Sequence, residues 1–438
     1  MTVTDTPASA DPAPRAADWL GRVLDEVDDG RAEMLALLGD LVRRPSVGGS
    51  AEENDTQARF AAVLHDEGME TDHWQVPLPD LLAADDFPGV EVPREEAWGL
   101  VGRLPGRGDG PSLMLNGHID VVPTGPVANW RDRSPFSGAV VGGELYGRGA
   151  CDMKAGLVAA LWAVRALRRA RVPLRGDVLL ASVQGEEDGG LGTYALLRRG
   201  WRADACVIPE PTSLDLVPAN AGSLTFRLSI PGHATHASRR LEGVSAIANL
   251  WTVQAALAEL EERRNRDVDP LFARWELAYP ISIGTVTAGS WASSVPDLLV
   301  AEGRMGVALD EPVEAARAEL EATVARACAA DRWLRHHPVE VQWWGGQFAP
   351  GRLPAGSDLL HRMRRVHRDV TGGPIRAVWG ATYGSDLRLM AAAGIPTLHY
   401  GPGDARLAHG PDERVPVEEV LTAARTLAAF ALDHCGVG

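Results

Sequence analysis

The chain has 438 residues, too many for one ordinary hydrophobic core, so two domains are expected. Hydrophobic residues make up 45% of the sequence and charged residues 23%, which is typical of a water-soluble globular protein. The formal net charge of −16 argues against nucleic acid or an anionic membrane as a partner, because both require a basic face. No apolar run approaches the ~18 residues that a membrane-spanning helix needs.

Residues 1–15 are rich in Ala, Pro, Asp and Thr and have neither a basic start nor an apolar core. We therefore expect a disordered tail and no signal peptide. The cysteines have no Cys-x-x-Cys spacing, which predicts reduced thiols in a cytoplasmic protein. They are Cys151, Cys206, Cys328 and Cys435. For Cys151 a catalytic thiol and a small packing residue are both possible, and the second is favoured.

The first half of the chain predicts alternating helices and strands. Apolar residues recur at helical spacing over Asp18–Arg44, with a break near Gly30, and again over Glu52–Glu67. Val76–Trp98 is irregular and rich in Pro and Asp. Strands are expected at Leu100–Leu104, Leu113–Leu115, Asp177–Val183 and Ala203–Ile208, and helices at Ala155–Ala170 and Leu191–Arg199. The first two strands read as neighbours, and the order β-α-β-α-β predicts a parallel sheet covered on both faces.

Residues 221–346 have a different order of predicted helices and strands. Its order is β-α-β-β-α-β, the split unit of ferredoxin-like domains. The expected elements are Ser223–Ile230, Val244–Arg263, Ile281–Val286, Leu298–Val307, Pro312–Ala330 and Val339–Trp343. The first pattern then resumes with helices at Asp358–Val370, Gly384–Ala393 and Val417–His434 and a strand at Thr397–Tyr400. The predicted fold class is therefore α/β: a mostly parallel-sheet domain (16–220 and 347–438) with an inserted ferredoxin-like α+β domain (221–346).

Chemistry-bearing residues follow the expected strand Leu113–Leu115. His118 and Asp120 come at its carboxyl end, where ligands bind in open α/β sheets, and their i, i+2 spacing puts both side chains on one side of an extended backbone. His118 is placed to bind a metal while Asp120 orients its ring. Asp152 lies in the Gly-rich stretch Gly147–Gly156, and its carboxylate has two oxygens with which to bridge two metal ions. Taken alone, a His-x-Asp is more often an ordinary turn or a satisfied polar pair than a metal site.

Further acids and a histidine follow in order. Glu186 and Glu187 come after the strand Asp177–Val183, Glu210 follows the next strand, and His409 lies in a turn near the C-terminus. Adjacent glutamates at a strand end are able to divide labour, one binding a metal and the other holding and deprotonating a water molecule. Taken singly, the three segments are also typical of a solvated acidic loop, a capped turn and a surface histidine.

These motifs, in this order, resemble the M20 family of zinc peptidases and amidohydrolases, which includes acetylornithine deacetylase, succinyl-diaminopimelate desuccinylase and aminoacylase. The resemblance extends from about Leu37 to the C-terminus. It implies that two Zn²⁺ ions, with Co²⁺ or Mn²⁺ as possible substitutes, are bound by one His and one Glu each. The implied pairs are His118 with Glu210 and His409 with Glu187, and the implied bridge is Asp152. Glu186 is then the general base.

The resemblance also implies roles for the inserted domain. A histidine there reaches into the cleft of a partner subunit and stabilises the oxyanion, which makes the enzyme a homodimer; His236 fits this position and His233 is the alternative. Ser293 stands where many relatives have Asn. Arg304 is a candidate cation for a substrate carboxylate, with a solvated strand residue as the alternative. Asp386 is expected to support the site.

The expected activity is hydrolysis of an N-acyl amino acid or short peptide, of the acetylornithine deacetylase kind. The branch resemblance rests on Trp130, Gly147–Gly156 and Trp291–Asp297. Desuccinylase or dipeptidase activity is the alternative, and a non-catalytic dimeric binding protein is an alternative of another class. A hydrolase with a Ser or Cys nucleophile is not expected, because the sequence has neither a Gly-x-Ser-x-Gly motif nor a suitably placed Cys/His pair. The other histidines are expected at the surface: His336, His337, His361 and His367.

Overall fold

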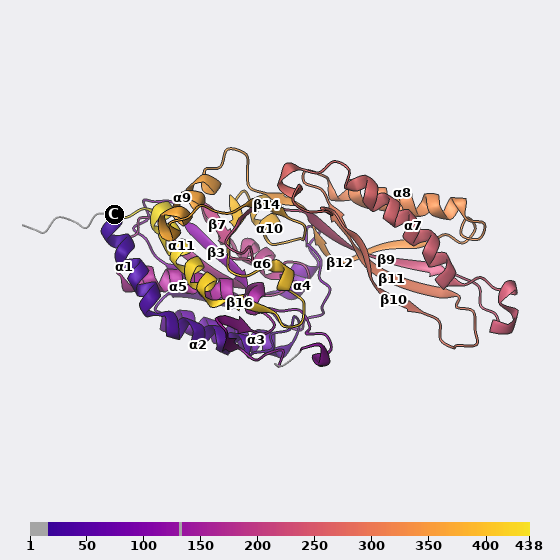
Figure 1. Cartoon of the computed structure of the whole chain (residues 1–438), viewed down its shortest axis with the longest axis horizontal. Helices are drawn as coiled ribbons and strands as arrows, with labels where there is room; N and C mark the ends of the chain where they lie inside the picture. Colours follow the sequence, from indigo (N-terminus) through magenta and orange to yellow (C-terminus); the bar gives the residue numbers. More distant parts are fainter. Residues whose placement is uncertain (1–15, 131–133) are drawn as a thin grey trace, which may run out of the picture.

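The structure is a computed structural model that describes residues 16–130 and 134–438. The tail expected at residues 1–15 lies outside this range. Figure 1 shows a larger part, which contains both the first helix α1 and the last helix α11, and a smaller part that projects from it. Within the described residues, no helix is long and apolar enough to cross a bilayer. The four cysteines are buried and free, as their spacing predicts.

The larger part is built on a nine-stranded sheet with the order β1-β2-β6-β3-β7-β15-β8-β13, in which β14 also pairs with β8. Strands β6, β3, β7 and β15 are parallel to their neighbours in this series, so the predicted parallel core is confirmed. The strands are β1 (Glu70–Gln75), β2 (Trp98–Leu104), β3 (Leu113–His118), β6 (Val178–Val183), β7 (Ala205–Ile208), β8 (Leu216–Asn220), β13 (Gly351–Arg352), β14 (Val378–Ala381) and β15 (Thr397–His399).

Helices cover both faces of this sheet, as predicted. Alternate residues of β6 serve the two faces: Val178 and Leu180 pack in the core with α5 and α11, whereas Leu179 and Ala181 pack in the core with α6 and α10. Gly30 separates α1 from α2, because the Trp162 ring lies against it and leaves no room for a side chain. The helices are α1 (Ala16–Asp29), α2 (Arg31–Val42), α3 (Ala51–Asp66), α4 (Leu78–Leu82), α5 (Ala155–Arg169), α6 (Leu191–Arg199), α9 (Leu359–Thr371), α10 (Leu387–Ala392) and α11 (Val417–Cys435).

The prediction that β2 and β3 are neighbours is wrong. Strand β6 lies between them, antiparallel to β2 and parallel to β3. The connection 105–112 crosses the start of β6, where Arg107 and Gly108 donate backbone hydrogen bonds to Leu174 and Arg175. The connection therefore spans one strand instead of forming a hairpin.

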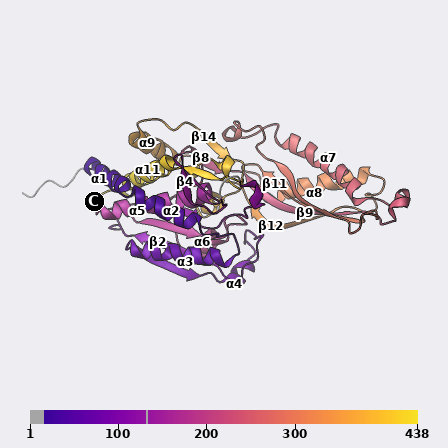
Figure 2. The same ribbon diagram turned by 60° about the horizontal axis from the view of Figure 1, so that its bottom comes forward.

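The smaller part, called the lid below, is a four-stranded antiparallel sheet with the order β10-β11-β9-β12 and two helices on one face, so the ferredoxin-like topology is confirmed. Both views show α7 and α8 side by side along this sheet (Figures 1 and 2). The elements are β9 (Gly222–Pro231), α7 (Ala246–Arg264), β10 (Ile281–Ala288), β11 (Leu298–Val307), α8 (Val313–Ala330) and β12 (Glu340–Phe348). The domain boundaries at residues 220 and 347 stay a prediction.

A third, small sheet joins two segments that are far apart in the sequence. Strand β16 (Arg414–Pro416) pairs with β5 (Glu144–Tyr146), which pairs with β4 (Ala139–Val141). The Gly147 N–H continues this pairing by donating to the Glu413 carbonyl. The sheet therefore holds the stretch before Asp152 beside the stretch after His409.

Candidate metal centre

The sequence-predicted ligands gather at the carboxyl ends of the parallel strands, where ligand sites form in open α/β sheets. His118 is the last residue of β3, Glu186 and Glu187 follow β6, and Glu210 follows β7. Asp152 lies directly before α5. The start of α5 packs closely against the segment that follows β7. Gly156, in the first turn of α5, allows this contact, because a Cβ there would lie 1.8 Å from the carbonyl oxygen of Pro209.

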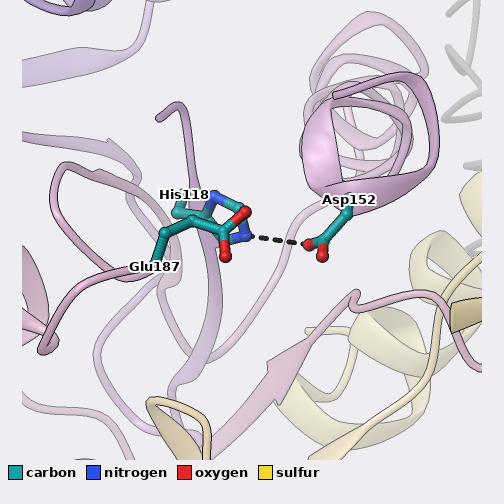
Figure 3. Close-up of side chains that lie close together, drawn as sticks. All are labelled: His118, Asp152 and Glu187. Atoms are coloured by element: carbon teal, nitrogen blue, oxygen red, sulfur yellow. Dashed lines mark hydrogen bonds and ion pairs between the residues drawn. The ribbon is translucent and has the colours of Figure 1, made fainter. Parts of the chain in front are cut away.

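Asp152 lies between two histidines. Its Oδ1 is 3.1 Å from His118 Nε2, and its Oδ2 is 3.4 Å from His409 Nε2 (Figure 3 shows the first contact). His409 Nε2 is also 3.0 Å from Glu187 Oε2, and His118 Nε2 is 3.9 Å from Glu210 Oε1. One carboxylate thus spans two imidazoles, each of which has its own glutamate. This is the arrangement that a bridged pair of divalent ions requires.

Two sets of donor atoms lie within 4.8 Å of one another: His118 with Asp152 and Glu187, and His118 with Glu186 and Glu210. The second set contains Glu186, which the sequence resemblance makes a base and not a ligand. His409 belongs to neither set but contacts two members of the first through the distances above. The structure therefore brings all the predicted ligands and the predicted base together, while the division of roles between Glu186 and Glu187 stays a prediction.

The pKa values reflect a buried cluster of acids. Burial, reinforced by neighbouring carboxylates, raises the pKa of Glu186 and Glu210 well above the ordinary value. Burial opposes protonation of His118, but Asp152 and other acids outweigh it and raise its pKa well above normal. Glu187 and Asp152 raise the pKa of His409 to about 11. The cluster carries more negative charge than the protein neutralises, and its N and O donors fit divalent ions such as Zn²⁺, Co²⁺ or Mn²⁺.

Asp120 supports the site in two ways. The nearest Asp120 atom to His118 Nδ1 is the backbone carbonyl oxygen at 2.9 Å, whereas the carboxylate lies at 3.7 Å. The carboxylate instead accepts hydrogen bonds from the backbone N–H groups of Glu186, at 3.4 Å, and Glu187, at 3.2 Å. The main chain of Asp120 therefore orients the histidine ring, and its side chain positions the loop with both glutamates.

Sequence reasoning missed an ion pair behind the site. The buried carboxylate of Glu413 accepts from Arg148 at 2.5 Å and from the backbone N–H groups of Cys151, at 2.9 Å, and Asp152, at 3.1 Å. Arg148 also donates to the carbonyl of His409 at 3.0 Å. Arg148 lies within the Gly147–Gly156 stretch and Glu413 lies four residues after His409, so their closeness to predicted ligands was the available signal.

A cavity of about 600 Å³ opens at the site and is lined by both parts of the chain. The lid contributes Ser282 and Arg304, and the larger part contributes Tyr383. The Tyr383 hydroxyl is buried without a hydrogen-bond partner in the described part of the chain, and burial followed by Glu210 raises its pKa well above normal. Tyr383 lines the cavity while its hydroxyl is shielded from solvent, and sequence reasoning passed over this residue.

His236 does not line this cavity within the described chain. It is exposed, and its Nδ1 is 2.8 Å from the Ser238 hydroxyl. Ser293 lies beside it, because the Ser293 carbonyl accepts from the Ala237 N–H at 2.8 Å. Neither His236 nor the alternative His233 reaches the metal centre of its own chain, so the role across a dimer stays a prediction.

Three other predicted residues have clear surroundings. Cys151 is buried, and burial raises its pKa well above normal, which is expected of a packing residue. Asp386 is buried and accepts from the Thr193 hydroxyl at 2.5 Å, which agrees with structural support. The prediction that His367 lies at the surface is wrong: it is buried on the inner face of α9, with Nδ1 2.7 Å from the Tyr400 hydroxyl.

Comparisons with known proteins agree with this geometry. The profile of peptidase family M20/M25/M40 matches residues 114–433. The N-formyl-4-amino-5-aminomethyl-2-methylpyrimidine deformylase of Halalkalibacterium halodurans is 27% identical over 437 residues, 94% of this chain and 97% of that protein. The succinyl-diaminopimelate desuccinylase of Methylobacterium sp. is 36% identical over 401 residues, 88% of this chain and 92% of that protein.

Solved structures show the same fold. The dipeptidase Dug1p of Saccharomyces cerevisiae has a TM-score of 0.75 at 16% identity, over 95% of this chain and 98% of that one. An M20 metallo-carboxypeptidase of Sulfolobus solfataricus has a TM-score of 0.71 at 16% identity, over 91% and 98%. Since the family profile spans most of the chain and a desuccinylase is similar over nearly its full length, the protein belongs to peptidase family M20/M25/M40 and is a metal-dependent hydrolase of linear amides.

Proposed function

We propose that this enzyme uses two divalent metal ions to remove a small acyl group from the amine nitrogen of a low-molecular-weight substrate. The observation that carries the proposal is the placement of Asp152 between His118 and His409, beside a cavity that Asp152 and His409 line. Each histidine has a glutamate beside it, Glu210 or Glu187, which makes two adjacent N,O-donor sets. Such sets with room for water are typical of catalytic sites, whereas structural zinc sites are closed.

The proposed roles follow the donor chemistry. His118, Glu210, His409 and Glu187 hold the ions, and Asp152 bridges them. The ions, when bound, lower the pKa of water and polarise the acyl carbonyl. Glu186 lines the cavity and is 7% exposed, so its carboxylate is shielded from bulk solvent next to the reacting atoms. It takes a proton from the attacking water and delivers it to the leaving nitrogen.

The nature of the amine separates two candidate substrates. The acetylornithine type expected from the sequence, like a succinylated diamino acid, carries carboxylates. The aminopyrimidine formamide named for the relative of H. halodurans carries none. That relative matches nearly the full length of both proteins, so a deformylase activity joins deacetylase, desuccinylase and dipeptidase activity as a candidate.

A homodimer and a cytoplasmic location are part of the proposal. In the described part of the chain, the histidine that lines the cavity is the predicted ligand His409, and His236 of a second copy is our candidate to stabilise the oxyanion. Such a donor acts on charge that develops only during the reaction, so it contributes to turnover more than to binding.

The proposal is tested with purified protein loaded with Zn²⁺, Co²⁺ or Mn²⁺. Metal content is measured by mass spectrometry, and amine release is followed from N-formyl, N-acetyl and N-succinyl substrates and from dipeptides. We expect two ions per chain and metal-dependent release of one amine. Full activity in protein stripped by a chelator would contradict the proposal.

A further inference from the structure

The cation that the lid presents to the cavity is already paired. Arg304 projects from β11, and its Nη2 lies 2.9 Å from Oε1 of Glu91, which belongs to the stretch between α4 and β2. The same Oε1 accepts from the Thr225 hydroxyl at 2.8 Å and from the Gly346 N–H at 3.3 Å. In residues 16–130 and 134–438, nothing donates a hydrogen bond to Oε2. Both side chains line the cavity, so one carboxylate oxygen remains available there.

The backbone around Glu91 is held in place. Oδ2 of Asp188 accepts from the N–H groups of Glu91, at 3.1 Å, and Val92, at 2.8 Å, and from Arg94 Nη1 at 2.9 Å. The Arg94 side chain is only 3% exposed, and it also contacts the buried carboxylate of Glu53 at 3.2 Å. Because Asp188 directly follows Glu186 and Glu187, Glu91 is positioned relative to the metal centre.

Apart from the proposed metal ions, the described side chains that line the cavity include no unpaired cation for a substrate carboxylate. Among the described lining residues, the basic side chains are Arg304 and His409. His409 contacts Glu187 and Asp152, and Arg304 contacts Glu91. A carboxylate that approached Arg304 would have to displace Glu91 or lie beside a like charge, and like charges a few ångströms apart repel each other.

We propose that Glu91 and Arg304 select an amine that carries no carboxylate and that presents an N–H donor beside a nitrogen acceptor. The edge of an amino-substituted nitrogen heteroaromatic has this pattern. Oε2 of Glu91 accepts from the exocyclic amino group, and the remaining N–H groups of Arg304 donate to the ring nitrogen. Both hydrogen bonds involve an ionised partner and are therefore of the stronger kind. This inference rests on the proposed function, and it replaces the N-acyl amino acid expected from the sequence.

The reaction on such a substrate balances without a further reactant. A water oxygen bonds to the acyl carbon, and the bond between that carbon and the nitrogen breaks. The proton that leaves the water passes through Glu186 to the nitrogen. For a formamide the products are formate and the primary amine of the heteroaromatic compound, and no atom changes its oxidation state.

The test uses three formamides, so that the acyl group is constant. They are the formamides of 5-aminomethyl-4-aminopyrimidine, of benzylamine and of phenylglycine; the last two differ only in a carboxylate. For the metal-loaded enzyme we expect kcat/KM to fall in the order given, with a difference of about tenfold or more between the first and last, the size of one charge-assisted hydrogen bond.

Two variants test whether Glu91 determines specificity. The readout is the ratio of kcat/KM between substrates, because a loss of folded enzyme lowers both values equally and leaves the ratio unchanged. Glu91→Gln removes the acceptor charge and releases Arg304, so it should lower the ratio of aminopyrimidine to phenylglycine formamide at least about tenfold. Glu95→Gln is the matched control: Glu95 is exposed on the same stretch and does not line the cavity, so the ratio should stay unchanged. A wild-type preference for the phenylglycine formamide, or an unchanged ratio in Glu91→Gln, overturns the inference.

Calorimetry of product binding distinguishes failure of this inference from failure of the proposed function. Metal-loaded enzyme is titrated with 5-aminomethyl-4-aminopyrimidine and with phenylglycine. Tighter binding of the aminopyrimidine that Glu91→Gln abolishes, without turnover of any N-formyl, N-acetyl or N-succinyl amide or dipeptide, contradicts the proposed reaction and supports the selection by Glu91. Turnover of formamides together with tighter binding of phenylglycine supports the reaction and overturns the selection.

Discussion

Arg148 and Glu413 form a buried ion pair between the two loops that carry Asp152 and His409. Glu413 binds the backbone of Asp152, and Arg148 binds the carbonyl of His409. Neither Arg148 nor Glu413 is a predicted metal ligand. The pair nevertheless sets the distance between the predicted bridging ligand Asp152 and the predicted terminal ligand His409.

We predict that Glu413→Gln weakens metal binding about 10–100-fold, the usual effect of losing a group that orients ligands. The change also leaves the Arg148 charge buried without its partner, which costs about 3–5 kcal/mol of unfolding free energy. Metal-buffered titration and urea denaturation measure the two effects. In the double variant Arg148→Gln/Glu413→Gln, stability should recover in part while metal affinity stays low. Unchanged metal affinity in Glu413→Gln would show that the pair serves packing alone.

Glu186→Gln should retain the metal and lose turnover by about 10²–10⁴-fold, because the amide cannot accept the proton from water. Metal analysis decides between the two roles that the geometry allows. Two ions per chain identify Glu186 as the base. If metal content falls in Glu186→Gln and stays normal in Glu187→Gln, the two glutamates have the reverse assignment.

His236 is predicted to act in the partner's cleft, so complementary variants should restore each other. His236→Ala and Glu186→Gln should each be nearly inactive, but a mixed dimer has one site with both groups. Random exchange of subunits then gives about a quarter of the wild-type rate, since half of the dimers are mixed and half of their sites are complete. A mixture of Glu186→Gln with Glu187→Gln is the control and should stay inactive. If mixing His236→Ala restores nothing, His236 does not work across the dimer.

His399 should make stability fall in acid. It is fully buried beside Ser385, and burial lowers its pKa to about 3, whereas the unfolded chain has the ordinary value near 6.5. Between these values the unfolded state binds a proton that the folded state does not, so unfolding becomes easier as pH falls from about 6.5 towards 3. The slope approaches ~1.4 kcal/mol per pH unit.

Urea denaturation of metal-free protein at pH 7 and pH 5 measures this contribution, and metal-free samples exclude the loss of ions as the cause. His399→Gln should show a smaller loss between the two pH values than the wild type. His361→Gln, at an exposed position on α9, is the matched control and should behave as the wild type does. Equal losses in His399→Gln and the wild type would rule out His399 as the titrating group.

The sequence predicted the parallel core and the metal centre for the same reason. Strands β3, β6 and β7 are short apolar runs bounded by turn residues, and the functional side chains come directly after them. Strand β1 is polar because it lies at the sheet edge, and β8 contains Pro218, so neither has the pattern of a buried strand. The insertion of β6 between β2 and β3 is a long-range pairing that local patterns do not encode.

The charged pairs were harder to predict than the ligands. Glu91 lies in an irregular, Pro-rich stretch, and its partner Arg304 is more than two hundred residues away, on β11 of the lid. Arg304 was predicted to be available to a substrate carboxylate. Its partner Glu91 could not be foreseen, because Glu91 lies in a stretch with neither helical nor strand periodicity. His367 looked like a surface residue on a polar helix, but the packing of α9 against the core turns that position inward.

The lid inserts between β8 and β13, which are paired strands of the larger sheet. Every predicted metal ligand and the predicted base lie outside the inserted segment, whereas Arg304 lies within it. The proposed recognition pair therefore spans both parts, because Glu91 lies in the larger one, and the predicted oxyanion donor His236 lies in the lid. A substitution at Arg304 is then free to change which amine is accepted while every residue predicted to hold a metal ion stays unchanged.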